Sequence, residues 1–343
     1  MILPLSETQS VKVISAASVR SFEDFKALQQ RELGSVPFIL RDTPQQQVGK
    51  FSVQALEEEF GEIALPQLSA NRAAFLVADQ GDADVMEADP SKWNAVGHSF
   101  KDLTQAIRNG SPYYVSMRTE NRSCKREGNQ VLYDPSKCSD GSNAVLKAIM
   151  PKAPVPELLP LGVDFVTIIW LGSKGRNFGL HSDLFTEQFV LQSEGVKEAL
   201  LLLPRDASLI NPFSFLESEK FYKSQHRSCA RLPKGGIKGE ILRAELHPGD
   251  ILYIPPMWWH EFITLSDGPS LSTTFRIHLP ENKQFYNALD NIFKLYTGSL
   301  EHGRDRLAQH IASFFGSACA AAQPALQGSK DRNHVATAFC LVG

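Results

Sequence analysis

The stretch that decides the fold is HPGDILYIPPMWWH, residues 247–260. Its Pro-Gly-Asp triplet predicts a turn, and the apolar run 251–254 that follows predicts a buried strand. The two prolines after this run have no N–H to donate, so the hydrogen-bond ladder must break there. The next strand then opens with His260, which places a histidine where the chain turns from one strand to the next.

Short apolar runs bounded by turn residues surround this stretch. They are 164–172, 187–193, 198–203, 241–246, 251–254, 261–265 and 271–277. Several short strands at this spacing predict a sandwich or barrel rather than a parallel α/β sheet. Apolar residues at helical spacing lie outside them, at 21–28, 51–60, 285–296 and 307–315. We therefore expect a mainly β fold with flanking helices.

Composition and charge exclude several classes of protein. The 343 residues include 43% hydrophobic and 21% charged residues with a net charge of −3, which is typical of a globular protein without a bulk electrostatic affinity for nucleic acid or anionic membrane. The five cysteines are scattered with no C-x-x-C pair, which argues against a disulfide framework or a structural zinc site and suits a reducing compartment. No apolar stretch is long enough to span a membrane. We expect a cytoplasmic protein, or a nuclear one if the source is eukaryotic.

A second motif supplies candidate metal ligands. His181 and Asp183 are two residues apart, so in an extended strand both side chains point to the same face. Together with His260 they form a set of two imidazoles and one carboxylate. Such a set leaves coordination positions open and favours Fe(II) over structural zinc.

These motifs resemble those of one enzyme family. His181-x-Asp183, the Gly-Val-Lys that ends fourteen residues after the aspartate, and the block 247–260 are similar to the JmjC or cupin-like Fe(II)/2-oxoglutarate-dependent oxygenases of the small hydroxylase type. The resemblance covers roughly residues 34–278. It implies a double-stranded β-helix, also called a jelly roll, with the metal at its open end.

The resemblance also implies roles for individual residues. His181, Asp183 and His260 become the iron ligands, and Lys197 binds the distal carboxylate of 2-oxoglutarate. A cation at the start of an apolar strand is costly to bury unless an anion joins it, which supports this role for the lysine. Arg276 stands sixteen residues after His260, where other 2-oxoglutarate oxygenases place a carboxylate-binding arginine, so it is the alternative to Lys197 and the two could divide the task.

Three further residues are candidate co-substrate contacts. Gln188 lies nine residues before Lys197 and offers an amide to the co-substrate or to iron-bound water. Tyr113 and its neighbour Tyr114 match an upstream strand tyrosine that family members turn toward 2-oxoglutarate. Phe178 departs from the family, because many relatives carry a threonine there.

The expected function is an Fe(II)- and 2-oxoglutarate-dependent dioxygenase that hydroxylates an unreactive C–H bond and releases succinate and CO2. The target is a protein side chain or a small molecule, and no residue is assigned to binding it. An N-demethylase using the same chemistry, a cupin metalloprotein that does not use 2-oxoglutarate, and a non-catalytic binding protein stay open as alternatives. Nucleic acid is a disfavoured partner, and no membrane is expected.

The domain organisation follows from the position of the motifs. Residues 1–280 are expected to form the catalytic domain, and 281–343 a helical appendage that caps the barrel or pairs with a second copy in a homodimer. Two basic loops, 118–126 and 220–238, are either solvated faces or surfaces that recruit an acidic substrate.

Overall fold

The structure is a computed structural model. It describes residues 8–30, 36–42, 51–62, 75–78, 99–111, 113–118, 124–127, 130–133, 149, 152–161, 163–175, 180–183, 186–212, 227–231 and 241–277. All of these belong to the first of two compact units, Met1–His278. The expected C-terminal helices, Phe178 and most of both basic loops lie outside the described residues. No helix in the described part of the chain is long and apolar enough to cross a membrane.

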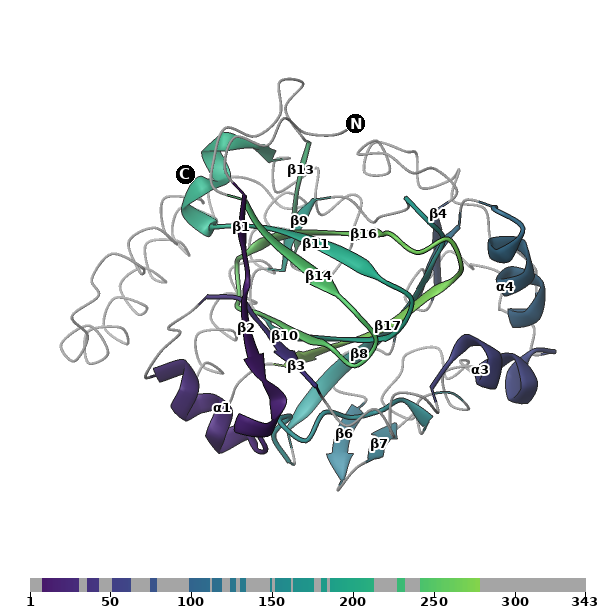
Figure 1. The fold of residues 1–343 in the computed structure, drawn as a ribbon, viewed down its shortest axis with the longest axis horizontal. Coiled ribbons are helices and arrows are strands. Elements are labelled where there is room, and N and C mark those ends of the chain that lie inside the picture. Colours follow the sequence, from purple (N-terminus) through teal and green to yellow (C-terminus); the bar gives the residue numbers. More distant parts are fainter. Residues whose placement is uncertain are drawn as a thin grey trace, which may run out of the picture. The chain divides into compact units, whose positions relative to one another are not determined.

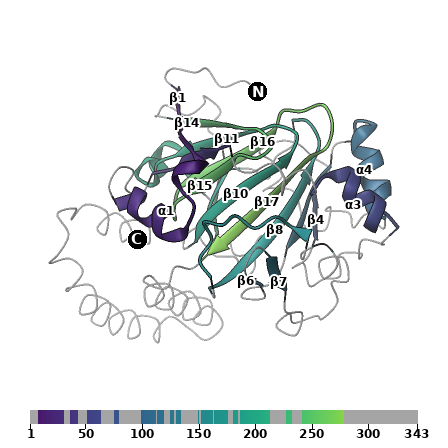
Figure 2. The ribbon, with the colours of Figure 1, turned by 60° about the horizontal axis from the view of Figure 1, so that its bottom comes forward.

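In the described part of the chain, the larger of two sheets has ten strands. Its order is β2 (Lys12–Ser15), β3 (Phe38–Arg41), β15 (Ile251–Ile254), β10 (Glu187–Glu194), β17 (Ser270–Ile277), β8 (Asp164–Gly172), β5 (Tyr114–Arg118) and β4 (Phe75–Ala78), with β6 (Cys124–Glu127) beside β8 and β7 (Gln130–Tyr133) beside β6. Figure 2 shows β15, β10, β17 and β8 side by side in this order.

The smaller sheet has seven strands and faces the larger one (Figure 1). Its order is β1 (Thr8–Ser10), β14 (Ile241–Leu246), β11 (Lys197–Leu202), β16 (Trp259–Thr264), β9 (His181–Asp183), β13 (Arg227–Arg231) and β12 (Asn211–Pro212). From β14 to β17 the chain passes from one sheet to the other at every step. This confirms the predicted mainly β fold with a jelly-roll core.

One part of the space between the sheets is filled by apolar side chains. Alternate residues of each strand point inward. The inward residues of this core are Val11, Ile39, Val190, Ala199, Leu201, Ala244, Leu246, Leu252, Ile254 and Trp258. Burying one such side chain of Leu or Ile size contributes about 1.5–3 kcal/mol. This packed region is a rigid base for the polar residues farther along the same strands.

The outer face of the larger sheet is covered by helices. α3 (Val53–Phe60) and α4 (Phe100–Arg108) bury their apolar faces against the outward residues of β5 and β8. α1 (Phe22–Leu28) inserts Phe25 against Phe189 and Tyr253, with ring centroids 5.2 and 5.0 Å apart. Each of these helices begins after a serine whose hydroxyl accepts a hydrogen bond from a backbone N–H of the first turn, which stabilises the helix start.

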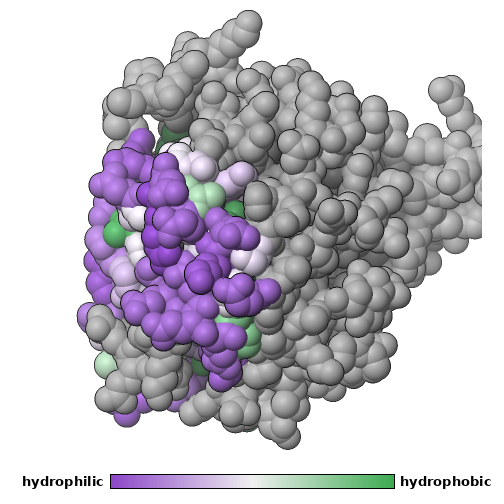
Figure 3. All heavy atoms as spheres, turned by 90° about the vertical axis from the view of Figure 1, so that its right-hand side faces the viewer, coloured by the Kyte–Doolittle hydropathy of each residue, from purple (hydrophilic) through white to green (hydrophobic). Residues whose placement is uncertain are grey.

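Short 3-10 helices complete the described elements, at Ala16–Ser18 and Pro204–Leu209. The described surface on the side of α3 and α4 is mostly hydrophilic, as Figure 3 shows. The helices therefore turn their polar faces to solvent and their apolar faces to the sheet.

The turn predicted before β15 is present and anchored. Gly249 has a positive φ of 96°, which glycine adopts without steric cost, and its N–H donates to the Gln192 carbonyl at 2.8 Å. Asp250 is buried, and its Oδ2 accepts a hydrogen bond from Arg41 Nη2 at 2.9 Å. The chain also breaks at the two prolines as predicted, since β15 ends at Ile254 and β16 begins at Trp259.

Candidate metal centre and its pocket

The three predicted metal ligands meet at one point of the smaller sheet. β9 carries His181 and Asp183, and β16 pairs with it so that His260 stands directly opposite His181. Asp183 Oδ2 lies 4.0 Å from His181 Nε2 and 3.8 Å from His260 Nε2. All three side chains are buried, and their ligand atoms lie within 4.8 Å of one another. The three residues could therefore hold one metal ion.

The ring of His260 is oriented as a metal ligand requires. Its Nδ1 lies 3.0 Å from the carbonyl oxygen of Trp258. A carbonyl can only accept, so Nδ1 carries the proton and donates it, which leaves the lone pair of Nε2 free toward Asp183. Two imidazoles and a carboxylate on one side of a site suit Fe(II) with open positions. The donor set therefore fits the iron that the sequence resemblance implies.

The turn between β15 and β16 holds both ligand-bearing strands. Met257 adopts a left-handed backbone conformation with φ 68°, which is uncommon for a residue with a side chain. Its N–H donates to the carbonyl of Asp183 at 3.1 Å. The turn that delivers His260 is thus tied directly to the strand that carries Asp183.

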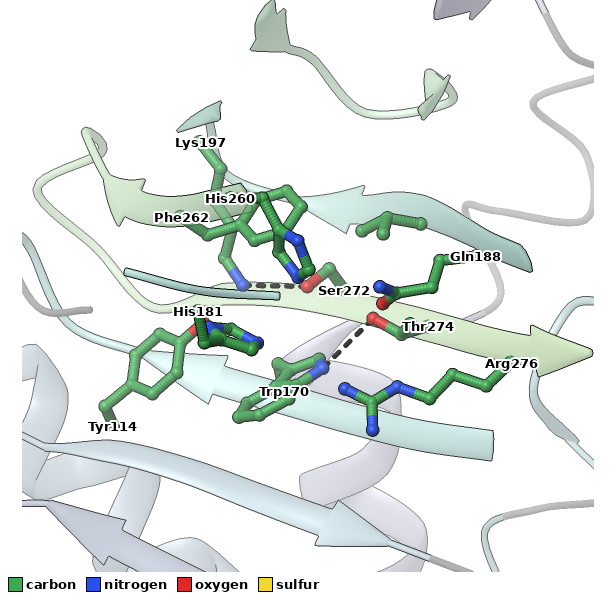
Figure 4. Close-up of a pocket in the computed structure, with 11 residues that line it drawn as sticks. Tyr114, Trp170, His181, Gln188, Lys197, His260, Phe262, Ser272, Thr274 and Arg276 are labelled. Atoms are coloured by element: carbon green, nitrogen blue, oxygen red, sulfur yellow. Dashed lines mark hydrogen bonds between the residues drawn. The ribbon is translucent and has the colours of Figure 1, made fainter. Parts of the chain in front are cut away.

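A pocket between the sheets opens onto these ligands (Figure 4). Its lining residues are Tyr114, Trp170, His181, Gln188, Val190, Lys197, His260, Phe262, Ser272, Thr274 and Arg276. Of the predicted site residues, the pocket brings together both histidines, Lys197, Gln188 and Arg276. Asp183 contacts it through Arg276.

Lys197 is the unusual charge of this pocket. It is 1% exposed, its Nζ donates to Ser272 Oγ at 2.7 Å, and Nζ lies 5.4 Å from the ring centroid of Tyr114. Burial lowers the pKa of Lys197 to about 7. Among the residues that the structure describes, no carboxylate lies within ion-pair distance of it. A buried cation in this setting favours binding of an anion from solution.

Arg276 has a different environment. Its Nη2 lies 2.6 Å from Asp183 Oδ2, and both side chains are buried. On β17 it stands opposite Gln188 of β10, and both line the pocket. The two candidate carboxylate-binding cations therefore differ, because the arginine is paired with a carboxylate of the protein and the lysine is not.

The structure places the two candidate tyrosines differently. Tyr114 lines the pocket, whereas Tyr113 packs against the apolar cluster under α3 and α4 on the other face of the sheet. Successive residues of an extended chain point to opposite faces, so only one of the two can reach the pocket. Tyr114 is therefore the tyrosine of the candidate site.

Sequence reasoning missed the inward face of β17. Ser270 accepts a hydrogen bond from Gln192, Ser272 accepts one from Lys197, and Thr274 accepts one from Trp170 Nε1 at 3.0 Å. The signal was present in SLSTTFRI, residues 270–277, where every second residue is polar and the last of these is Arg276. Alternation of this kind predicts a strand with one polar face.

Comparison with known proteins agrees with this geometry. The profile of the "Cupin-like domain" family matches residues 82–276. HSPB1-associated protein 1 of Bos taurus is 29% identical over 120 residues, which is 34% of this chain and 24% of the relative. tRNA wybutosine-synthesizing protein 5 of Gallus gallus is 27% identical over 128 residues, 37% of this chain and 38% of the relative. Jumonji C domain-containing protein 5 of Drosophila melanogaster is 31% identical over 110 residues, 31% of this chain and 26% of the relative.

The matched stretches thus span well under half of each relative, while the family profile spans more than half of this chain. The family generally contains Fe(II)- and 2-oxoglutarate-dependent oxygenases. With its two facing sheets and the His-Asp-His group on one of them, the chain belongs to the cupin-like domain family, of the JmjC type.

Proposed function

We propose that this protein is an Fe(II)- and 2-oxoglutarate-dependent oxygenase that hydroxylates an unreactive C–H bond of a protein side chain or a small molecule. The observation that carries the proposal is Lys197, a fully buried lysine in the same pocket as two of the three candidate metal ligands. A metal site alone would suit many cupins. A metal site beside a buried cation suits a co-substrate that chelates the metal at one end and carries a second carboxylate at the other.

His181, Asp183 and His260 would hold Fe(II). When bound, iron supplies the activation of dioxygen in the overall reaction R–H + 2-oxoglutarate + O2 → R–OH + succinate + CO2. The protein's contribution is to fix the ligands and exclude water. The Trp258 carbonyl oxygen helps to fix one ligand, because it accepts a hydrogen bond from His260 Nδ1. The apolar core between the sheets excludes water on one side of the pocket.

Lys197 would bind the distal carboxylate of 2-oxoglutarate. Its ammonium group has three protons, one of which is donated to Ser272 Oγ, so others remain for the carboxylate. The Ser272 hydroxyl accepts from Lys197 and can donate its own proton to the same carboxylate. The ring of Tyr114 faces the ammonium group and restricts its position. Gln188 contributes an amide at the metal end of the pocket.

The relatives' names suggest which substrates to test. One name refers to an association with HSPB1, and another to the synthesis of wybutosine in tRNA. A hydroxylation on an N-methyl carbon would release the methyl group as formaldehyde, so a demethylase shares the site chemistry. A substrate panel should therefore contain proteins, methylated peptides, small molecules and tRNA.

The proposal is tested by succinate formation. Purified protein is loaded with Fe(II) without oxygen, then given 2-oxoglutarate, air and the substrate panel. Wild type should form succinate, and His181→Ala should form none above background. Equal succinate from wild type and His181→Ala across the whole panel would exclude a 2-oxoglutarate oxygenase.

A binding measurement separates the remaining alternatives. Mn(II)-loaded wild type should bind 2-oxoglutarate in calorimetry, and Lys197→Met should not. A metal-binding cupin that does not use 2-oxoglutarate would bind Mn(II) and show no heat with the co-substrate. A binding protein without turnover would bind both and form no succinate.

A further inference from the structure

We propose that Arg276 is a positioning residue for the metal site: it holds the carboxylate of Asp183 toward the two histidines and is not a second anchor for 2-oxoglutarate. The inference rests on the proposed metal site. It assigns to Arg276 a task that acts through Asp183.

The geometry at the carboxylate supports this role. Arg276 Nη2 lies 2.6 Å from Oδ2 of Asp183, and the same Oδ2 lies 4.0 and 3.8 Å from the Nε2 atoms of His181 and His260. A carboxylate oxygen has two lone pairs, so one can face the guanidinium while the other faces a metal ion. The contact with Arg276 therefore limits rotation of the carboxylate while leaving a lone pair for coordination.

The placement of Arg276 makes this contact rigid. It lies on β17 between β10 and β8, opposite Gln188 and Val166, in the interior of the larger sheet. Its side chain is 4% exposed, so few other rotamers are open to it. Asp183 belongs to the smaller sheet, and the pair thus joins the two sheets at the metal site.

The same placement argues against a shared grip on the distal carboxylate. Lys197 donates to Ser272, which is four residues before Arg276 on the same strand. At about 3.3 Å per residue, the two backbone positions lie roughly 13 Å apart. Figure 4 shows the lysine and the arginine at opposite ends of the pocket. One carboxylate cannot satisfy both cations while Arg276 stays on Asp183.

Two effects of Arg276 oppose each other. A guanidinium near a divalent cation repels it, which would weaken metal binding. Against this, a carboxylate ligand that loses its partner is free to turn away, and removal of such partners typically lowers metal affinity by about 10–100-fold. The carboxylate of Asp183 would lie between the guanidinium and a metal ion bound by the two histidines, and would screen one from the other. We therefore expect orientation to outweigh repulsion.

The experiment measures metal affinity directly. Co(II) is titrated into the full chain and followed by its visible absorbance, for wild type, Arg276→Gln, Arg276→Lys and Arg41→Gln. The matched control is Arg41, which pairs with buried Asp250 at 2.9 Å away from the pocket. Arg276→Gln should bind Co(II) about 10–100-fold more weakly, and Arg276→Lys should fall between it and wild type. Arg41→Gln should melt at a lower temperature and bind Co(II) like wild type.

A second titration distinguishes positioning from co-substrate binding. At saturating Co(II), 2-oxoglutarate should bind Arg276→Gln and wild type with similar affinity. Unchanged or tighter Co(II) binding by both Arg276 variants would overturn the inference, as would normal metal binding with loss of 2-oxoglutarate. If Arg276→Gln does not fold, Arg276→Lys decides by the same criteria. Failure of wild type to bind Co(II) or form succinate would instead reject the proposed function.

Discussion

Replacing Lys197 by methionine should stabilise the protein while removing co-substrate binding. Methionine is unbranched and similar in length, so it fills the space of the lysine stem and places no charge in the pocket. In the wild type the lysine Nζ is held by Ser272 and faces the Tyr114 ring, but burial still lowers its pKa to about 7. The substitution removes the free-energy cost of burying this charge.

The magnitude follows from the pKa. A pKa shift from 10.5 to about 7 means that burial disfavours the ammonium form by roughly 5 kcal/mol. At pH 7.5 the folded protein avoids most of this cost by releasing the lysine proton, and that release itself costs about 4 kcal/mol of folding free energy. At pH 7.5 the lysine is mostly neutral, so only the lost hydrogen bond to Ser272 offsets this cost, by about 1 kcal/mol. The net gain for Lys197→Met is therefore roughly 2–3 kcal/mol. At about 2–4 °C per kcal/mol, its Tm should rise by several degrees.

The pH dependence gives an internal check. The folded chain has the lower pKa, so between about 7 and 10.5 the unfolded chain binds more protons and wild-type stability rises with pH. The advantage of Lys197→Met should hence be largest below pH 7 and shrink by pH 9. Thermal unfolding at both pH values measures this, and Lys174→Met, at an exposed position paired with Asp267, should leave Tm unchanged. A destabilised Lys197→Met protein, or one that binds 2-oxoglutarate like wild type, would refute the reasoning.

Three further outcomes test the same structure. Because only protonated Lys197 attracts a carboxylate, the KM for 2-oxoglutarate should rise about tenfold per pH unit above pH 7. In Lys197→Arg, which stays charged, the KM should not change with pH. Initial-rate assays from pH 6 to 8.5 measure both. Gly172→Ala should raise that KM and lower Tm, because the added Cβ would lie 2.6 Å from Cδ2 of Tyr114 and push its ring off the lysine; an unchanged KM would show that the ring is free to adjust. Tyr253→Phe should lower the free energy of unfolding by about 1–3 kcal/mol, because the Tyr253 hydroxyl accepts a hydrogen bond from Gln29 and donates one to buried Glu187. Binding of 2-oxoglutarate, measured by calorimetry, should persist because this hydroxyl faces α1 and not the pocket.

The β fold could be predicted because its signals are local. The prolines after Ile254 and the Pro-Gly-Asp triplet before Ile251 act through the backbone, and both turns are where the sequence places them. Pairing between distant segments leaves no such mark. The parallel pairing of β1 with β14 joins segments more than 200 residues apart, which no local pattern marks. The helix α4 was missed although its local signals were present, namely the capping box of Ser99 with Asp102 and apolar residues at helical spacing.

The candidate site shows the same division. His181, Asp183 and His260 come together because strand geometry puts the first two on one face and the double proline delivers the third. The sequence left two neighbouring tyrosines as candidates, and only the residues beyond them reveal which one faces the pocket: Ser116 shares a face with Tyr114, while Val115 and Met117 face the helices. The partner of Arg276 depends on two strands from different sheets, so no spacing in the sequence could predict it.

The inward face of β17 shows how the two cations of the pocket, Lys197 and Arg276, differ in their partners. Along this strand each inward polar group is assigned a partner from another strand: Ser270 to Gln192, Ser272 to Lys197, Thr274 to Trp170 and Arg276 to Asp183. Three of these pairs leave no unbalanced charge, whereas the lysine adds a charge that a serine hydroxyl cannot neutralise. A stable core would not retain such a charge, since methionine would pack as well at lower cost. The position of Lys197, on a strand beside that of His260, therefore supports the proposal that an anion binds beside the candidate metal site, at the expense of stability.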